Sequence, residues 1–375
     1  MQRTISSVAL TMLATLVAAC GDGGGEGLAR VGGAAGDPAA AAPGSAESNQ
    51  TAAAASARCP AGIPEPKSIV TDPNASDVSI AGSHVFYRSL TKVVRVNKDG
   101  TGQADVVESP DLIRSFVVGT TLLTVDSPTP PTAELHVYDL DAQGAVASGV
   151  LGAKAEGLTI TTKSNAGGTW VIGSDAENLY LHADEENAEV IYSLGRTKDG
   201  TLTEVLRLTE RVMSHPQIDG SSLWYVIDGQ RVFRLALDAG AASKTEKGPK
   251  EIFGIGYASC GLAVGAGKAF CATGATLEQR DMDGANLKPV LEMEKSKARA
   301  AVDSAMFGAG ALIVRTEFAP KNDGLGRVLR ALKPSATGVE ESIVACGRGS
   351  LSDVAVDATS IVWLEPGKGL FTVPR

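Results

Sequence analysis

The sequence predicts an all-β fold, a single β-propeller of seven four-stranded blades, from three observations. A short apolar strand, a tight turn and a second strand rich in aromatic and branched residues recur about every 46 residues. A second hairpin follows most copies, and its Asp-Gly or related turn suits that geometry because both turn residues tolerate positive φ. Glycine is abundant, with 43 residues, which favours turns over long helices.

The first hairpin of the repeat is clear in four copies and looser in three. The clear copies are residues 78–89, 216–228, 261–273 and 354–365, and the looser copies are residues 115–126, 170–182 and 305–316. The turn positions of the seven copies are predicted at Gly82, Gly119, Gly173, Gly220, Gly265, Gly308 and Asp357. The second hairpins are residues 93–108, 196–208, 232–240 and 277–292. Four-stranded units of this length pack face to face around an axis, because a single blade cannot bury both of its faces. A long third unit leaves six or eight blades open, and a two-domain β-sandwich is the main alternative fold.

The last unit, residues 352–375, has only three strands before the chain ends. We expect residues 67–71 (KSIVT), from the start of the domain, to supply its fourth strand. This 3+1 closure would complete a ring that removes most exposed sheet edges. The predicted propeller therefore spans residues 58–375.

The N-terminal residues predict export. The apolar run of residues 8–19 is too short to span a bilayer and has the length of a signal-peptide core. It ends in Val17-Ala18-Ala19-Cys20, which resembles the bacterial lipobox and implies a signal peptide of residues 1–19 and lipidation of Cys20. An ordinary secretory signal cut near Ala19 is the alternative. Residues 20–57 are mostly Gly, Ala, Ser and Pro, which predicts a flexible tether.

Five cysteines become four once Cys20 is lipidated. An even number in an oxidising compartment favours two disulfides. Cys260 and Cys271 flank a predicted hairpin, so we pair them, and Cys59 with Cys346 would then join the two ends of the domain. The alternative is that all four are reduced and buried.

The repeats resemble the YWTD and TolB-like propeller families in residues 84–100 (HVFYRSLTKVVRVNKDG) and 223–240 (LWYVIDGQRVFRLALDAG). The resemblance covers most of the domain, although the full YWTD tetrapeptide is absent. It implies the propeller fold and a tendency toward binding roles, with no particular ligand.

Composition and motifs narrow the function. The net charge of −9 speaks against nucleic acid as a partner, because nucleic acid recruits basic surfaces. No nucleophile elbow, HExxH pair, P-loop or dinucleotide-binding glycine motif is present. The four histidines fall in separate stretches, and no CxxC pair exists, so we predict no catalytic residue, metal or cofactor.

Propellers usually bind ligands where the inner strands begin. The segments before the first strands predict a rim that includes Asp77, Asp111, Ser214, His215, Arg299, Arg348 and Ser352. Three of these, His215, Arg299 and Arg348, could clamp an anionic group, since guanidinium binds carboxylates in a bidentate manner. Asp184 and Glu185 are expected in a loop on the same rim, where a hard cation is possible and a solvated acidic loop is the commoner meaning.

Two functional hypotheses follow. The first is a non-enzymatic binding or scaffolding lipoprotein of the bacterial cell envelope, whose partner is an envelope protein or a small ligand on the propeller face. The second is an envelope lyase or hydrolase with its site at the channel mouth, because propellers also host chemistry.

Overall fold

The computed structural model describes residues 61–129, 132–147, 159–161, 169–196, 201–209, 213–237, 249–255, 260–273, 276–292, 301–308, 311–317, 327–334, 339–348 and 351–375. All of these residues belong to one compact unit, Gly44–Arg375. The predicted signal peptide, the tether, Cys20 and Cys59 lie outside the described residues. Within that described part, no helix has the length and apolar character that crossing a membrane requires.

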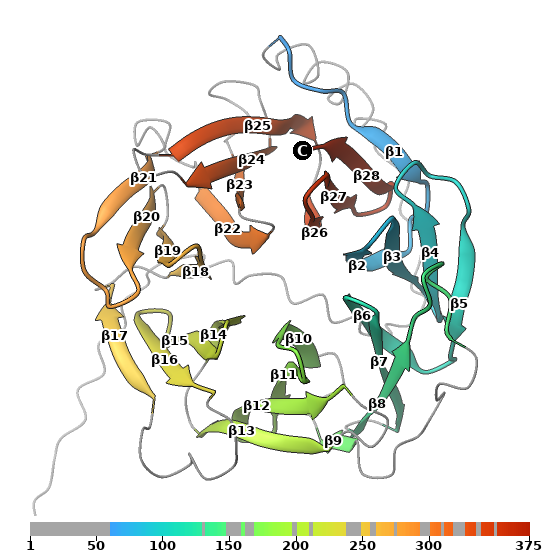
Figure 1. Ribbon diagram of the computed structural model, residues 1–375, viewed down its shortest axis with the longest axis horizontal. Coiled ribbons are helices and arrows are strands. Elements are labelled where there is room, and N and C mark those ends of the chain that lie inside the picture. Colours follow the sequence, from blue (N-terminus) through green and yellow to red (C-terminus); the bar gives the residue numbers. More distant parts are fainter. Residues whose placement is uncertain are drawn as a thin grey trace, which may run out of the picture. The chain divides into compact units, whose positions relative to one another are not determined.

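The described strands form seven four-stranded sheets, one for each predicted unit, set as blades around a common centre (Figure 1). Blades 1 to 3 are β2 (Ala75–Ala81), β3 (His84–Ser89), β4 (Lys92–Asn97) and β5 (Ala104–Glu108); β6 (Leu112–Val118), β7 (Thr121–Thr129), β8 (Thr132–Asp139) and β9 (Thr159–Thr161); and β10 (Thr169–Ser174), β11 (Asn178–Glu185), β12 (Ala188–Gly195) and β13 (Leu202–Thr209). The chain is thus all-β and a single β-propeller, as predicted.

Blades 4 to 6 continue the same order. They are β14 (Met213–Asp219), β15 (Ser222–Ile227), β16 (Arg231–Ala236) and β17 (Lys250–Gly254); β18 (Gly261–Gly265), β19 (Lys268–Thr273), β20 (Thr276–Asp281) and β21 (Lys288–Glu292); and β22 (Ala301–Gly308), β23 (Ala311–Glu317), β24 (Arg327–Pro334) and β25 (Val339–Arg348). Each blade meanders outward, with its first strand innermost.

Blade 7 closes the ring with strands from both ends of the domain. It contains β26 (Ser352–Val356), β27 (Ser360–Glu365), β28 (Gly369–Pro374) and, at its outer edge, β1 (Lys67–Val70). β1 pairs antiparallel with β28 through Lys67–Thr372, Ser68–Phe371 and Val70–Leu370. The predicted 3+1 closure is therefore present, with residues 67–70 as the fourth strand.

The apolar core lies between the blades. The second strand of a blade has neighbouring blades on both faces, so it is buried along its whole length, as in β15 and β27. Trp224 and Trp363, on these two strands, are fully buried, and each belongs to a cluster shared with the adjacent blade. The strands that the pattern identified by aromatic and branched residues are thus the ones that build the core.

The predicted Asp-Gly turns hold neighbouring blades together. Gly100 and Gly284 both have φ of +88°, and a Cβ there would lie 3.1 Å from Ile69 O and 2.8 Å from Ile252 O, respectively. Both contacted strands, β1 and β17, are the outer strands of the preceding blade. Glycine is required because the backbone is left-handed and the approach to the neighbouring strand leaves no room for a side chain.

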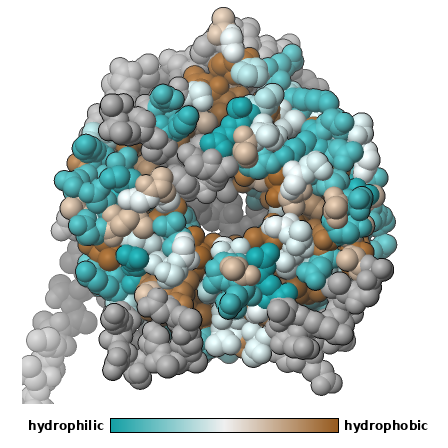
Figure 2. Space-filling view, in the orientation of Figure 1, coloured by the Kyte–Doolittle hydropathy of each residue, from teal (hydrophilic) through white to brown (hydrophobic). Residues whose placement is uncertain are grey.

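The surface of the described residues is mixed in polarity. Figure 2 shows hydrophilic and apolar residues interspersed over the face that it presents, with apolar colour in several separate places. Among the described residues, the exposed large hydrophobic side chains are Leu90 and Leu287. Leu90 follows β3 and Leu287 precedes β21, so they lie at opposite ends of their blades. We call the end where innermost strands begin, marked by Asp77, the mouth end.

Candidate functional site

Asp77 is a buried carboxylate at the mouth end, in the first strand of blade 1. It lies near the start of β2, is 8% exposed, and has a positive φ of 53°. The pairing register of β2 with β3 shifts between Ser76 and Ser79, so Asp77 sits in a β-bulge. A bulge redirects a side chain out of the regular alternation. Here it turns a carboxylate toward the neighbouring blade.

The Asp77 carboxylate joins blades 1 and 2. Arg88 Nε of the same blade donates to Oδ2 at 2.8 Å, and Arg114 Nη1 of β6 donates to Oδ1 at 2.9 Å. The backbone N–H of Ser115, also on β6, donates to Oδ2 at 3.1 Å. Hydrogen bonds between ionised groups are stronger than neutral ones, and stronger still away from water. The contact therefore fixes the first strands of two blades relative to each other.

A second aspartate repeats this device between blades 7 and 1. Asp353 lies near the start of β26, has a φ of 43°, and also sits at a register shift, between Ser352 and Val354. Its Oδ2 accepts the backbone N–H of Asp77 at 3.1 Å. Both aspartates occupy the middle of a Ser-Asp-Val triplet. Side chains of this triplet thus connect the inner strands of three consecutive blades.

Neutral side chains make the equivalent contact elsewhere. Ser79 Oγ accepts the Val117 N–H at 3.2 Å, again between blades 1 and 2. Gln217 of β14 accepts the Val264 N–H at 3.0 Å and donates to the Leu262 carbonyl, which joins blades 4 and 5. Each of these contacts needs a side-chain acceptor that reaches an N–H of the next inner strand. That acceptor is charged in some blades and neutral in others.

A buried histidine and glutamate form a second polar cluster in blade 3. His182 is fully buried on β11, and its Nε2 lies 2.7 Å from Oε2 of Glu189 on β12. The Trp170 ring, directly opposite in β10, lies 4.0 Å from the His182 ring centre to centre. Both ring nitrogens of His182 and Oε2 of Glu189 are buried without a hydrogen bond among the described residues, so the 2.7 Å approach is a close contact that lacks hydrogen-bond geometry. Trp170 and the sheet shield this pair from solvent, so it is not placed to reach a substrate.

The expectation that Asp184 and Glu185 lie in a loop is wrong. Both belong to β11, where Asp184 pairs with Glu189 and Glu185 pairs with Ala188. Asp184 is 4% exposed and is engaged in polar contacts, so it is no solvated acidic residue. The reason is that blade 3 has long strands, and its turn is confined to residues 186–187.

Glu185 is committed to a network on the side of blade 3. It accepts hydrogen bonds from Tyr192 Oη and from Arg207 Nη1, the latter at 2.8 Å, and Arg207 also binds Glu204 at 2.9 Å. Burial, and then the contact with Glu185, raise the pKa of the Tyr192 hydroxyl above its usual value. The contacts with Glu204 and Glu185 likewise raise the pKa of Arg207. Glu185 is therefore held in the sheet by these two contacts, and its role in binding a ligand stays a prediction.

Blade 2 carries a further acidic position at the mouth end. Asp126, near the end of β7, is 8% exposed and accepts the Ser109 hydroxyl at 2.6 Å. His136 Nε2 lies 3.6 Å from Asp126 and 4.0 Å from Glu134. Ser109 belongs to the connection from blade 1, so this contact too crosses a blade boundary.

The predicted anion clamp lies mostly outside the described residues. His215 falls in β14 and Arg348 ends β25, but the description does not extend to their side chains, and Arg299 lies outside it altogether. The clamp stays a prediction. The described rim residue Asp77 is instead held between two arginines, neither of which the sequence analysis singled out.

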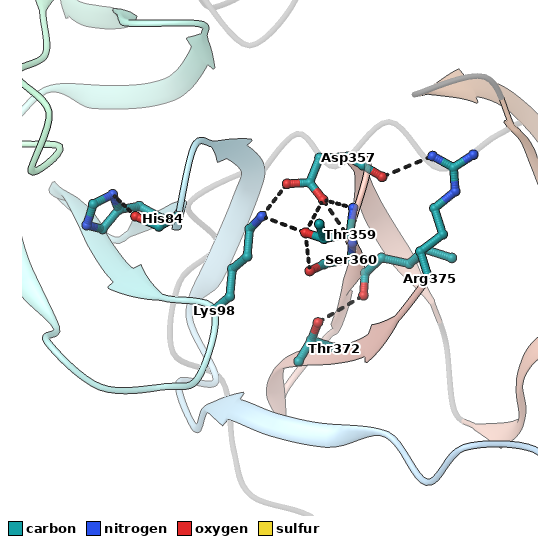
Figure 3. Close-up of polar contacts among 9 residues, drawn as sticks. His84, Lys98, Asp357, Thr359, Ser360, Thr372 and Arg375 are labelled. Atoms are coloured by element: carbon teal, nitrogen blue, oxygen red, sulfur yellow. Dashed lines mark hydrogen bonds and ion pairs between the residues drawn. The ribbon is translucent and has the colours of Figure 1, made fainter.

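At the opposite end of the ring, Lys98 joins blade 1 to blade 7 (Figure 3). It follows β4, and its Nζ donates to Asp357 and, at 3.2 Å, to Thr359 Oγ1, both in the turn between β26 and β27. Burial alone would raise the pKa of Asp357, but hydrogen bonds from Lys98, Thr359 and Ser360 hold it below its usual value. Figure 3 also shows Arg375 binding the Asp357 carbonyl, which ties the C-terminal residue to the same turn.

His84 lies on the same side of blade 1. Its Nε2 lies 3.3 Å from Arg95 Nη1, and Nδ1 lies 3.3 Å from Ser83 Oγ. Burial, and then the nearby Arg95 charge, lower the pKa of His84 below 6.5, while Asp141 opposes them. The neutral imidazole is therefore the form that the fold favours.

One predicted disulfide is present. Cys260 and Cys271 are bonded, with Cα atoms 5.3 Å apart, and both are buried in blade 5. Cys346 of β25 is also disulfide-bonded, and its predicted partner, Cys59, lies outside the described residues. The pairing of Cys346 with Cys59 stays a prediction.

The described side chains of the mouth end are suited to joining neighbouring blades and to keeping this end of the propeller rigid. Among the residues that the structure describes, no group of three or more His, Cys, Asp or Glu is arranged to hold a metal ion. Three described carboxylates of the mouth end receive hydrogen bonds from a neighbouring blade or its connection, namely Asp77, Asp126 and Asp353. Sequence reasoning placed Asp77 on this rim but missed its two arginines; the repeated Ser-Asp-Val triplet was the signal available in the sequence.

Comparison with solved structures agrees with the fold. The chain is similar to a chain of the mitotic checkpoint complex (TM-score 0.52, 11% identity, 90% of this chain and 99% of that one). It is also similar to Kluyveromyces lactis Hsv2 (0.51, 10%, 78% and 90%) and to the β-propeller domain of the Trilobed protease from Pyrococcus furiosus, which has an open velcro topology (0.51, 10%, 82% and 94%). These likenesses show the propeller fold alone. No protein-family model and no curated protein matches the chain.

Proposed function

We propose that this protein is a non-enzymatic binding or scaffolding module of the bacterial cell envelope, held to a membrane by a lipid on Cys20. The observation that carries the proposal is the Asp353–Asp77–Ser115 chain of contacts, which joins the inner strands of blades 7, 1 and 2. A face whose strands are cross-linked in this way is preorganised, and a rigid surface loses less entropy when a partner binds.

The chemistry of the mouth end favours binding over catalysis. A general acid or base must exchange a proton with substrate, and its pKa is tuned for that task. Asp77 instead forms ion pairs with Arg88 and Arg114 while accepting a backbone N–H, so its oxygens are committed to the fold. The Glu185 oxygens are occupied in the same way by Tyr192 and Arg207.

Three features support an envelope location. Residues 17–20 resemble a lipobox, and residues 20–57 have the composition of a flexible tether. The Cys260–Cys271 disulfide fits an oxidising compartment, since such bonds persist outside the cytosol.

Two further features concern the partner. The net charge of −9 favours a protein or a small ligand over nucleic acid. The fold serves protein assembly elsewhere, since one similar propeller is a chain of the mitotic checkpoint complex.

The anchor is tested by partitioning cell extracts between detergent and aqueous phases. Wild-type protein is expected in the detergent phase, with a mass increase on the N-terminal peptide that matches acylation. The Cys20→Ala variant is expected in the aqueous phase. Recovery of both proteins in the aqueous phase would show an ordinary secretory signal.

The scaffolding role is tested by crosslinking in cells, followed by purification of the tagged, lipidated protein. We expect one envelope protein at near-stoichiometric yield with wild type and a strong loss with Cys20→Ala. Recovery of no protein partner, together with turnover of a glycan or peptide by the purified domain, would replace this proposal with the lyase or hydrolase hypothesis.

A further inference from the structure

Leu90 is a large apolar side chain in an exposed and strained position at the mouth end. It lies in the two-residue loop between β3 and β4, is 60% exposed, and has a φ of 52°. A lone exposed leucine is ordinary, but a bulky residue with a positive φ is a genuine outlier. Two-residue hairpin loops place Gly, Asn or Asp at such positions. The exposure and the backbone conformation of position 90 therefore both disfavour leucine.

The corresponding loop of blade 4 adopts the same conformation with a polar residue. Asp228 follows the second strand of its blade, as Leu90 does, and has a φ of 53°. Aspartate tolerates the left-handed region because its short side chain can hydrogen-bond locally. Residues held in strained conformations cluster at ligand-binding and switch sites. A blade thus folds with a polar residue at this position, and the leucine of blade 1 points to a contact with another molecule.

The loop that carries Leu90 is braced on both of its residues. Arg88 Nη1 donates to the Leu90 carbonyl at 3.1 Å, while Nε of the same guanidinium donates to Asp77 at 2.8 Å. The Thr91 carbonyl accepts the N–H of Ser109, in the connection to blade 2, at 2.9 Å. The leucine is therefore presented in a fixed place, and a preorganised group loses less entropy when a partner binds.

The side chains that flank this loop present guanidinium groups to solvent. The Arg88 and Arg114 side chains are 22% and 24% exposed, whereas the Asp77 side chain between them is 2% exposed. Asp353 adds a carboxylate here, but its Oδ2 accepts the Asp77 N–H and is engaged by the fold. A guanidinium has five N–H donors, and the contact with Asp77 uses only part of them. The outward chemistry beside Leu90 is thus that of a carboxylate-binding group.

We propose that Leu90, Arg88 and Arg114 form a docking epitope for a protein segment in which an apolar side chain lies beside a carboxylate. The apolar side chain covers Leu90, and the carboxylate accepts hydrogen bonds from the outer edges of the two guanidinium groups. Hydrogen bonds between ionised groups of this kind give a docked segment a defined orientation as well as affinity. This inference rests on the proposed scaffolding role and names the chemistry of the partner at the mouth end.

The first test needs no partner and measures the thermal unfolding of the Leu90→Gly variant. Glycine adopts a positive φ without strain, so we expect the variant to unfold at the same temperature as wild type or at a higher one. A lower unfolding temperature would show that Leu90 serves the fold, and it would overturn the inference.

The second test measures how much partner is recovered by crosslinking in cells with the full, lipidated chain. We expect Leu90→Ala to lower the recovery tenfold or more. The matched control is Leu287→Ala, which shortens the exposed leucine at the opposite end and is expected to leave the recovery unchanged. Equal recovery with wild type and Leu90→Ala would overturn this inference and leave the scaffolding role standing. Recovery of no partner with wild type would overturn both.

The chemistry of the partner is tested with a benzophenone amino acid at position 90, which keeps an apolar side chain there. Mass spectrometry then identifies the peptide that the probe captures in cells. We expect a segment of another protein that carries Asp or Glu next to an apolar residue. Capture of a phospholipid, of a second copy of this chain, or of a segment without a carboxylate would overturn the inference.

Discussion

The junctions on either side of blade 1 and the junction between blades 4 and 5 use different chemistry in the same architecture. Around blade 1, charged groups cross the boundary at both ends: Asp77 at the mouth end and Lys98 at the other. Between blades 4 and 5, the corresponding contacts are the neutral Gln217 and an apolar cluster that contains Trp224 and Phe253. Among the described residues, the charged side chain of Arg280 also crosses there, and it lies over the Phe253 ring rather than in an ion pair with blade 4. The blades thus share one four-stranded architecture, while the contacts between neighbouring blades differ in polarity.

The residue that follows the third strand shows this difference most clearly. In blades 1 and 3 it is a cation, since Lys98 reaches the turn of blade 7, and Arg196 binds Thr121 and the Val118 carbonyl in the turn of blade 2. In blades 2, 4 and 5 the position is apolar, and its side chain packs in a cluster shared with the preceding blade; these residues are Leu140, Leu237 and Met282. The position needs a side chain that spans the boundary, and either a charge or an apolar group meets that need.

The largest effect on this comparison is expected from Asp77→Ala. The substitution leaves Arg88, Arg114 and the Ser115 N–H without their buried acceptor, and breaking a buried pair from one side costs about 3–5 kcal/mol. Urea unfolding monitored by tryptophan fluorescence measures the loss. The control is Asp105→Ala, which removes a partner of Lys92 from an exposed pair and is expected to cost far less stability, because exposed ion pairs are screened by water. A similar small loss for both variants would show that the charged junction is dispensable.

The second-largest loss of stability is expected from Gly369→Ala, which affects the closure of blade 7. Gly369 has φ of +117°, and a Cβ there would lie 2.1 Å from the Val70 carbonyl oxygen of β1. The matched control is Gly367→Ala in the same blade, where φ is +76° and nothing lies within 4 Å. The control is expected to cost about 1 kcal/mol for backbone strain, and Gly369→Ala about 1–3 kcal/mol more for the clash. Equal unfolding free energies for the two variants would show that β1 accommodates the added methyl group.

Exchanging the charged and the apolar side chain at the position after the third strand is expected to give smaller and unequal losses of stability. Lys98→Met should cost about 1 kcal/mol or less, because the pair with Asp357 is partly exposed, and the loss should shrink at high salt. Met282→Lys should cost about 1–3 kcal/mol at any salt concentration, because a charge enters an apolar cluster. Thermal unfolding at low and high salt separates the two. A salt-independent loss of stability in Lys98→Met would show that the contribution of Lys98 is not electrostatic.

The smallest expected effect is a pH dependence from His84. Its pKa in the folded protein lies below 6.5, so as pH falls below 6.5 the unfolded chain takes up a proton that the folded chain does not. Stability is therefore lost between pH 6.5 and the lowered pKa, and it is unaffected by this group above pH 6.5. His84→Gln should flatten that part of the stability curve. An unchanged slope in the variant would assign the pH dependence to other groups.

The fold was predictable because each repeat can be identified from short sequence patterns of strands and turns. Gly82, Gly119 and Gly220 were predicted as turn positions, and all three have positive φ between first and second strands. Gly173 was also predicted as a turn, but it lies inside β10 against Ile218, and the turn falls two residues later. A Cβ there would lie 2.7 Å from Ile218, so this glycine reports a close approach between blades 3 and 4.

The site was less predictable because its partners come from different blades. Asp77 was predicted on the rim from its place before an inner strand, but Arg114 lies one blade further along the chain, and no local pattern links them. Asp184 and Glu185 were misplaced because strand length in blade 3 is set by packing on its neighbours, which the acidic run itself does not report. The disulfide within blade 5 was predicted because both cysteines flank one hairpin.

The most direct test of the account places a photo-activated crosslinking amino acid at Leu90 or at Leu287. Both side chains are exposed, at 60% and 49%, but Leu90 lies at the mouth end and Leu287 in a turn at the opposite end of its blade. If the mouth end presents the binding face, the probe at position 90 should capture one envelope partner in living cells and the probe at position 287 should not. Capture from position 287 alone, or equal capture from both positions, would contradict the mouth end as the binding face.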